Sequence, residues 1–332
     1  MGIGNIIFIV ILLAAAGAFA FQVSKIRRNI LLGKDLDRTD RPKDRWILMT
    51  KVALGQSKMV VRPVAGLMHI FIYAGFVIIN IEVLEIVIDG VFGTHRVFAF
   101  LGGFYDFLIG SFEILAFLVL FACVIFFIRR NALNIQRFRS KEMTGWPKND
   151  ANFILIVEVL LMFAFLSMNS ADYLLQQRGA DHYVVAGAYP ISNLMTPLFD
   201  WMSTDGLIIY ERSAWWFHID GILLFLNYLP ISKHFHIILA FPNVFYSKLQ
   251  SAGKFTNMDR VTDEVKLMMD PTADPYAAPP PADPEAVPEN VGAKDVQVLT
   301  WKNLMDAYSC TECGRCSSNC PANISGKLLS PR

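Results

Sequence analysis

Five apolar stretches separated by polar segments dominate the pattern along this chain. They lie at roughly Ile3–Phe21, Val64–Ile88, Phe107–Ile128, Asn152–Ser170 and Trp215–Tyr246. Most of them approach the ~20 residues that a helix needs to cross a ~30 Å hydrocarbon core. The pattern therefore predicts an all-α membrane protein built on a bundle of five transmembrane helices.

The composition agrees with this prediction and excludes some classes of function. Of the 332 residues, 54% are hydrophobic and only 18% are charged, which does not fit a soluble chain. The net charge is +1, from 30 basic and 29 acidic residues. No strong field surrounds such a protein, so nucleic acid is not expected as a partner.

The distribution of basic residues predicts the orientation of the helices. Residues 24–62 hold eleven Lys or Arg and residues 129–148 hold six, whereas the two opposite loops hold one and two. The positive-inside rule places both basic loops in the cytoplasm, with the N-terminus outside and the C-terminus inside. The first stretch lacks a positive segment before its apolar run, which favours an uncleaved anchor over a secretory signal.

Four of the five cysteines lie close together near the C-terminus. Cys310, Cys313, Cys316 and Cys320 follow the spacing C-x2-C-x2-C-x3-C-P of bacterial iron–sulfur ligation. This spacing favours a [4Fe–4S] cluster over a zinc site, which usually pairs two distant C-x2-C elements. Either Cys320 closes a single cluster locally, or a downstream part of the chain or another subunit supplies further ligands. We favour the second alternative, because the sequence after Pro321 contains no second run.

The composition also predicts how the chain divides into domains. Residues 1–248 are expected to form the membrane domain, and residues 296–332 a small, incomplete ferredoxin-like module in the cytoplasm. Between them, residues 249–295 are rich in proline and alanine, which predicts an extended linker.

Histidines within the spans indicate haem b ligation. His218 and His236 are 18 residues apart, which is five turns of a straight helix, so both can point from one face about 27 Å apart. His69 enters the second span at the level of His236, so the two imidazoles can hold one iron at the inner side. The outer partner of His218 is absent from the second span, and His95 in the short outer loop is the candidate. His234 faces away from His236 and is the poorer ligand unless the helix unwinds after Pro230.

The stretch from His218 to His236 resembles the last helix of the gamma, cytochrome b subunit of respiratory nitrate reductase. There too, histidines 18 residues apart bracket a Pro-x-Ser-basic segment, here Pro230 to Lys233. The fusion to a ferredoxin-type run resembles iron–sulfur oxidoreductases related to membrane-bound heterodisulfide reductase. The resemblance implies one or two haem b groups in a prokaryotic cytoplasmic membrane, exchanging electrons with menaquinone or ubiquinone and with cytoplasmic iron–sulfur clusters. The second span lacks the family's second histidine, and the cysteine-rich catalytic domains are absent from this sequence.

Carboxylates inside the spans are candidates for a quinol site, because burying them is costly. A carboxylate there accepts the hydroxyl proton as the electron leaves. Those expected in the outer half are Glu82, Glu85, Glu113 and Asp220, and Glu158 is expected in the inner half. Structural hydrogen bonding to neighbouring helices explains each of them equally well.

The favoured function is respiratory electron transfer between the quinone pool and cytoplasmic iron–sulfur clusters through haem b, with a cytoplasmic redox protein or a further iron–sulfur subunit as partner. Two alternatives remain. The chain is a non-catalytic anchor and electron conduit in a larger respiratory complex, or it is a membrane-tethered ferredoxin without haem. The direction of electron flow and the type of quinone do not follow from the sequence.

Overall fold

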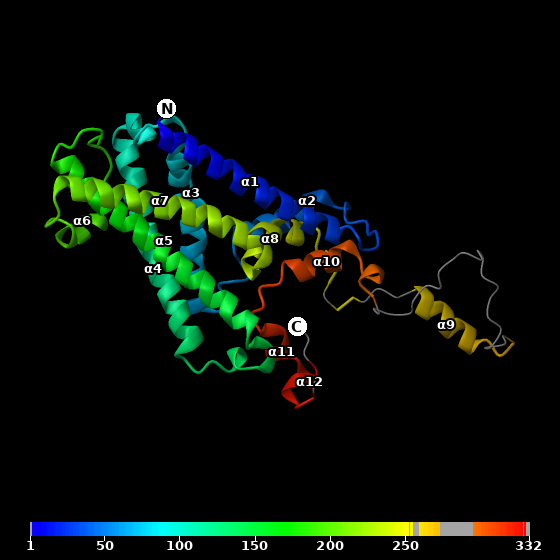
Figure 1. Cartoon of the computed structure of the whole chain (residues 1–332). Helices are drawn as coiled ribbons and strands as arrows, with labels where there is room; N and C mark the ends of the chain where they lie inside the picture. Colours follow the sequence, from blue (N-terminus) through cyan, green and yellow to red (C-terminus); the bar gives the residue numbers. More distant parts are fainter. Residues whose placement is uncertain (1, 252, 255–258, 273–294, 328, 330–332) are drawn as a thin grey trace. The chain divides into compact units, whose positions relative to one another are not determined.

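The computed structural model describes residues 2–251, 253–254, 259–272, 295–327 and 329. Within these ranges the chain is helical and contains no strand, only an isolated bridge between Lys34 and Thr300. Figure 1 shows the helices in sequence colours. They are α1 (Ile3–Ile30), α2 (Pro42–Met49), α3 (Pro63–Phe92), α4 (Gly103–Asn131), α5 (Trp146–Gln177), α6 (Ser192–Met195), α7 (Thr204–Tyr228), α8 (His236–Phe245), α9 (Asp259–Met269), α10 (Trp301–Tyr308), α11 (Arg315–Asn319) and α12 (Pro321–Ile324).

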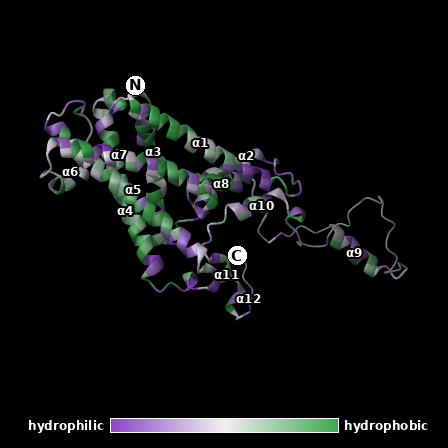
Figure 2. Cartoon of the chain, in the orientation of Figure 1, coloured by the Kyte–Doolittle hydropathy of each residue, from purple (hydrophilic) through white to green (hydrophobic). Residues whose placement is uncertain are grey.

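Four helices are long and apolar enough to cross a membrane, namely α1, α3, α4 and α5. A fifth candidate is the pair Thr204–Ile231 and Lys233–Phe245, which is bent by 91°. Figure 2 shows that hydrophobic residues gather along the long helices. The prediction of a helical chain with helices able to span a membrane is therefore confirmed, with five candidate spans if the bent pair counts as one.

The prediction of a single straight fifth helix is wrong. Pro230 has no N–H to donate, and the chain passes through short 3-10 turns before α8 begins at His236. The Ser232 hydroxyl oxygen accepts a hydrogen bond from the His234 backbone N–H (3.1 Å) and so caps the following turn. His218 and His236 therefore do not share one face of a straight helix.

A buried carboxylate from another helix holds this bend. Asp150, 1% exposed at the start of α5, accepts hydrogen bonds from the Tyr228 hydroxyl (2.5 Å), the Ser232 hydroxyl (2.8 Å) and the Lys233 backbone N–H (3.1 Å). These bonds satisfy groups that the interrupted helix leaves free. The bend is thus a specified part of the fold.

The chain divides into two compact units, each built from segments that are separate in the sequence. The first unit comprises Met1–Ser24, Gly55–His236 and Cys310–Arg332, and the second comprises Lys25–Leu54 and Ile237–Ser309. The cysteine run therefore belongs to the same unit as most of the membrane helices. Most of the predicted linker lies outside the described residues.

The core of the first unit forms where α5 packs on α4 and α7, and α3 packs on α4. Ile109, Phe112 and Phe165 lie at its centre, each no more than 2% exposed. Gly221 lets α7 approach α5 closely, because a Cβ there would lie 2.6 Å from Leu161 Cδ2. This close contact sets the position of His218, one turn earlier on α7.

The second unit is organised around a buried arginine. Arg45, 1% exposed on α2, donates to the carbonyl oxygens of Asp40 (2.7 Å), Phe245 (3.0 Å) and Ser247 (2.9 Å). The Trp301 ring stacks edge-on against Tyr246 at 5.2 Å. These contacts join three segments that are distant in sequence.

Candidate functional site

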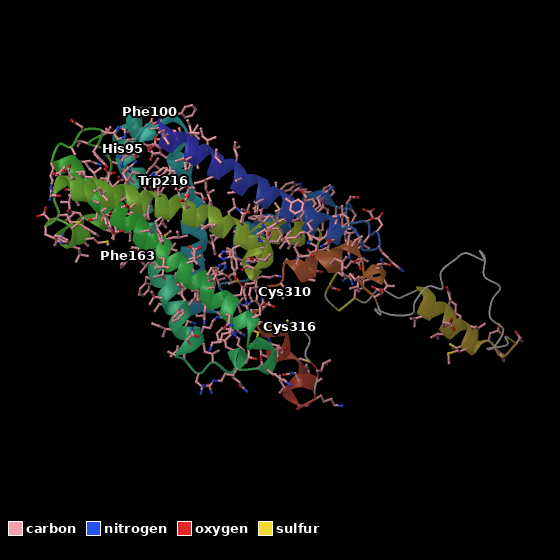
Figure 3. The ribbon with its side chains drawn as sticks, in the orientation of Figure 1. His95, Phe100, Phe163, Trp216, Cys310 and Cys316 are labelled. Atoms are coloured by element: carbon pink, nitrogen blue, oxygen red, sulfur yellow. The ribbon has the colours of Figure 1, made fainter. Side chains whose placement is uncertain are left out.

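The segment Cys310–Cys320, called the cysteine loop below, carries four free thiols. Cys310 and Cys316 are exposed, and Cys313 and Cys320 are partly buried. Figure 3 shows Cys310 and Cys316 at the end of the first unit far from His95. Within the described residues, no three His, Cys, Asp or Glu side chains are grouped so as to hold a metal ion. Convergence of the four thiolates on a cluster therefore stays a prediction.

The cysteine loop is docked on the membrane helices and their connecting loop. Gly314, with φ +71°, approaches the Arg137 backbone so closely that a Cβ would lie 2.9 Å from the carbonyl oxygen. On the other side, Lys233 Nζ donates to Glu312 Oε2 (3.1 Å) and to the carbonyl oxygen of Pro147 (2.6 Å). Sequence reasoning missed these contacts, because nothing local marks Lys233 and Glu312 as partners.

Buried donors beside the loop suit an anionic cluster. Arg137 Nε and Nη1, Arg315 Nε and Ser317 Oγ are buried and have no hydrogen-bond partner among the described residues. A buried guanidinium without an acceptor is costly unless something negative is bound beside it. A thiolate-ligated iron–sulfur cluster is such a group, since its sulfurs accept hydrogen bonds and its potential depends on them. The residues present therefore fit the group that the spacing predicts.

The structure brings the predicted inner histidines together. His69 interacts electrostatically with His236 and also with Arg315 of the cysteine loop. The His236 Nδ1–H donates to the Lys233 carbonyl oxygen (2.9 Å), which leaves Nε2 free for a metal. His69 Nδ1 is buried and has no hydrogen-bond partner within the part of the chain that the structure describes. The His234 ring contacts Phe225 at 5.4 Å and His236 at 5.8 Å, so it lies beside the pair.

The structure does not bring the two predicted outer histidines together. His218, 1% exposed, donates through Nδ1 to the Leu161 carbonyl oxygen (3.0 Å). His95 lies with Nε2 3.7 Å from Asp172 Oδ1 and its ring 5.5 Å from that of His182. Leu161 and Asp172 are both on α5, about 16 Å apart along its axis at ~1.5 Å per residue. That His218 and His95 hold one haem iron stays a prediction, and these contacts do not support it.

The protonation state of His95 follows from its surroundings. Burial lowers the pKa of His95 to about 4, although the nearby carboxylate of Asp172 opposes the shift. Its ring is therefore neutral at physiological pH. For the neighbouring Arg96, burial lowers the pKa, but the surrounding carboxylates and tyrosine hydroxyls, Asp172 first among them, together hold it well above its usual value.

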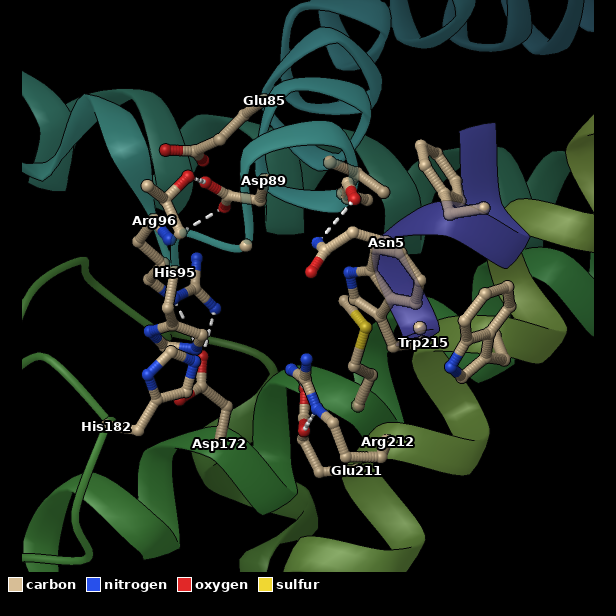
Figure 4. A pocket seen from close by; sticks show the side chains of 18 of the residues that line it. Asn5, Glu85, Asp89, His95, Arg96, Asp172, His182, Glu211, Arg212 and Trp215 are labelled. Atoms are coloured by element: carbon tan, nitrogen blue, oxygen red, sulfur yellow. Dashed lines mark hydrogen bonds and ion pairs between the residues drawn. The ribbon is translucent and has the colours of Figure 1, made fainter. Parts of the chain in front are cut away.

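A polar cavity of about 250 Å³ lies between α1, α3, α5 and α7 and the loop that carries His95 (Figure 4). Its wall contains more acidic than basic side chains, beside an aromatic face. The acids are Glu82, Glu85, Asp89, Asp172 and Glu211, the bases are Arg96 and Arg212, and the rings include Phe8, Trp215 and Trp216. This volume is just below the ~300–1,000 Å³ of sites for drug-sized molecules, so it suits a ligand with a single ring.

Arg96 holds the wall of the polar cavity in place. Its guanidinium donates to Asp172 (2.7 Å), the Tyr105 hydroxyl (3.2 Å) and the Asn169 side-chain oxygen (3.0 Å). The Tyr105 hydroxyl in turn donates to Glu85 (2.9 Å). Sequence reasoning missed Arg96 and Asp172, because both lie at span ends, where charges are ordinary.

The four carboxylates predicted for a quinol site lie in different environments. Glu82 and Glu85 are 3% exposed and line the polar cavity, and Glu82 Oε2 has no hydrogen-bond partner among the described residues. Glu113 accepts hydrogen bonds from the backbone N–H groups of Ile191 (2.9 Å) and Ser192 (3.0 Å), so it anchors the long loop. Asp220 is not part of the cavity wall.

Breaking the buried ion pair of Arg96 is expected to destabilise the protein. Arg96→Gln leaves the Asp172 carboxylate, 2% exposed, without its charge partner, at a cost of about 3–5 kcal/mol. Arg41→Gln is the matched control, because its pair with Asp44 (2.7 Å) is exposed and contributes about 0–1 kcal/mol. Thermal unfolding in detergent measures both, and equal melting temperatures for the two variants would contradict the role of Arg96.

Comparisons with known proteins find two similar oxidoreductases. The chain is similar to the probable iron–sulfur-binding oxidoreductase FadF of Bacillus subtilis (strain 168), with 27% identity over 326 residues, covering 98% of this chain and 41% of that protein. It is also similar to the EtfAB:quinone oxidoreductase of Syntrophomonas wolfei subsp. wolfei, with 25% identity over 330 residues, covering 97% of this chain and 41% of that protein. The chain thus spans about two fifths of the length of these curated relatives. No family model and no solved structure matches it.

These similarities support the coarser part of the sequence interpretation. One relative is named a probable iron–sulfur-binding oxidoreductase, and the other is named a quinone oxidoreductase. The described helices include four or five that are able to cross a membrane. The fold and the comparisons therefore define a helical protein with helices able to cross a membrane, similar to oxidoreductases of which one is named iron–sulfur-binding.

Proposed function

We propose that this chain carries electrons between a membrane quinone and iron–sulfur clusters on the cytoplasmic side, through haem b. The observation that carries the proposal is the position of His69. It interacts with His236, its predicted partner as haem ligand, and with Arg315, which lies between two predicted cluster ligands. Haem and cluster would each accept and release single electrons, and their predicted ligands belong to one compact unit.

The polar cavity is the proposed quinone site. Glu82 lies thirteen residues after His69 on α3, about 20 Å further along the helix at ~1.5 Å per residue. Trp215, Trp216 and Phe8 form the apolar wall that a quinone ring needs, and the ring centroids of Phe8 and Trp215 are 5.5 Å apart. The predicted orientation places this cavity toward the outside of the membrane.

Glu82 is the proposed proton acceptor in this site. A quinol loses two protons and two electrons on oxidation, and a carboxylate in the cavity wall can accept one hydroxyl proton at a time and release it before it takes the next. The free oxygen of Glu82 is available for this, whereas Glu85 already accepts from the Tyr105 hydroxyl and the Phe98 backbone N–H. For electron flow in the reverse direction, Glu82 returns protons to the quinone.

Reduction of the haem by a quinol tests this proposal. In membranes containing the full-length protein, Glu82→Gln is expected to slow quinol-driven haem reduction at least ~100-fold, the lower range for loss of a general base. Reduction of the same haem by dithionite should be unchanged. Glu158→Gln is the control, because Glu158 is a carboxylate of α5 that is not part of the cavity wall.

Each outcome of this experiment has a consequence. Equal quinol-driven rates in Glu82→Gln and the parent protein would contradict the cavity as the quinone site. Absence of haem b from the purified parent protein would overturn the cytochrome proposal and favour the tethered ferredoxin. Haem reduction by quinol only when a further subunit is present would favour the anchor and conduit alternative.

A further inference from the structure

A second cavity of about 180 Å³ lies where α4 ends and α5 begins. Three cationic side chains line it, namely Arg130, Arg139 and Lys148. The remaining wall comes from Asn131, Leu133, Ile135 and Phe138. This basic cavity is separate from the polar cavity, and neither the proposed haem ligands nor the proposed quinone site uses it.

None of the three cations has a carboxylate within ion-pair distance among the described residues, and buried Asp150 acts on Arg130 only from further away. The Arg130 guanidinium lies over the Phe138 ring at 4.7 Å, which restricts its position. The Asn131 side chain is already hydrogen-bonded to that of Asn152 (3.0 and 3.1 Å). Three like charges around one cavity repel each other, and an anion bound between them removes this cost.

The surroundings of the basic cavity indicate the kind of anion. Arg130 is in the last turn of one candidate span and Lys148 is in the first turn of the next, so the cavity lies at the level of a membrane surface. Leu133 in its wall is 51% exposed, and Trp146 at the start of α5 is 55% exposed. Exposed tryptophan and basic residues at span ends are typical of the headgroup layer. A ligand here needs an anionic group with an apolar body beside it.

We propose that the basic cavity binds the phosphodiester group of an anionic phospholipid. Arg130 and Arg139 present planar guanidinium groups that match phosphate oxygens, and Lys148 adds a mobile point charge. The acyl chains lie along the exposed apolar surface beside Leu133. Basic pockets at the ends of transmembrane helices bind such headgroups in this way.

Native mass spectrometry of the full-length protein tests this assignment. Protein extracted from vesicles of phosphatidylcholine with one fifth phosphatidylglycerol is expected to retain phosphatidylglycerol preferentially. The double variant Arg139→Gln/Lys148→Gln should weaken this retention about tenfold, because each basic residue near an anionic surface contributes measurably. Arg129→Gln/Lys141→Gln is the matched control, since it removes two charges between the end of α4 and the start of α5 without touching the cavity wall. Equal retention by the two double variants would overturn the proposal.

A second arm distinguishes lipid from free phosphate. The melting temperature in neutral detergent is measured with added inorganic phosphate and, separately, with added phosphatidylglycerol. A rise with phosphatidylglycerol alone, lost in Arg139→Gln/Lys148→Gln, supports the lipid site. An equal rise with millimolar inorganic phosphate would overturn the lipid assignment. Neither arm depends on haem, cluster or quinone. The phospholipid proposal can therefore fail while the proposed function stands, and the reverse also holds.

Discussion

Cys313→Ala is expected to abolish the iron–sulfur signal of this protein. Cysteine thiolates are the ligands of such clusters, and a loop that supplies three of them converges on one cluster. Loss of the central thiolate removes one of the ligands that the spacing of the run predicts. Low-temperature electron paramagnetic resonance of the dithionite-reduced protein, together with iron and sulfide content, measures the effect.

Cys123 provides the matched control for this prediction. It lies in α4, 1% exposed among apolar residues, far in sequence from the cysteine loop. Cys123→Ala should therefore keep the full signal. An undiminished signal in Cys313→Ala, or zinc in place of iron in the parent protein, would contradict the assignment.

Cys320→Ala separates the two alternatives for the fourth ligand. If Cys320 closes the cluster locally, this variant loses the same signal as Cys313→Ala. If ligands from further sequence or another subunit complete the cluster, the signal of the loop persists and a second cluster is affected. The curated relatives extend well beyond the length matched by this chain, which leaves room for the second arrangement.

His69→Ala is expected to remove the haem of the inner pair while the iron–sulfur signal stays. The iron needs an imidazole from each side, and His236 alone cannot hold it as a stable low-spin centre. The pyridine haemochrome assay measures haem per chain, and electron paramagnetic resonance of the same sample reports the cluster. Retention of the full haem content would contradict the pairing.

Comparing His234→Ala with His236→Ala tests which of these two histidines is the haem ligand. His236 has its Nδ1 hydrogen-bonded to the Lys233 carbonyl oxygen, an arrangement typical of an axial ligand. His234 instead has its ring edge-on to Phe225. His234→Ala should therefore retain haem with a small shift in its spectrum, whereas His236→Ala should lose it. The reverse result would exchange the two residues.

Some of the candidate site could be predicted from the sequence because its signals are local. The pair of Glu82 and Glu85 in one span already indicated a polar site, since carboxylates in apolar segments are costly. Glu113 carried the same signal but has another role. Its carboxylate bonds to the backbone of Ile191 and Ser192, almost eighty residues later, and no local pattern contains that information.

The sequence by itself determined the helical membrane class and the cysteine run, because runs of apolar residues and short ligand spacings are properties of consecutive residues. Only the tertiary structure decided that the fifth span bends, since Asp150 from another helix satisfies the broken turn. It also decided that the cysteine loop lies beside His69, through contacts such as that of Lys233 with Glu312. Such contacts join residues far apart in the chain, and they depend on how helices pack and which buried polar groups find partners.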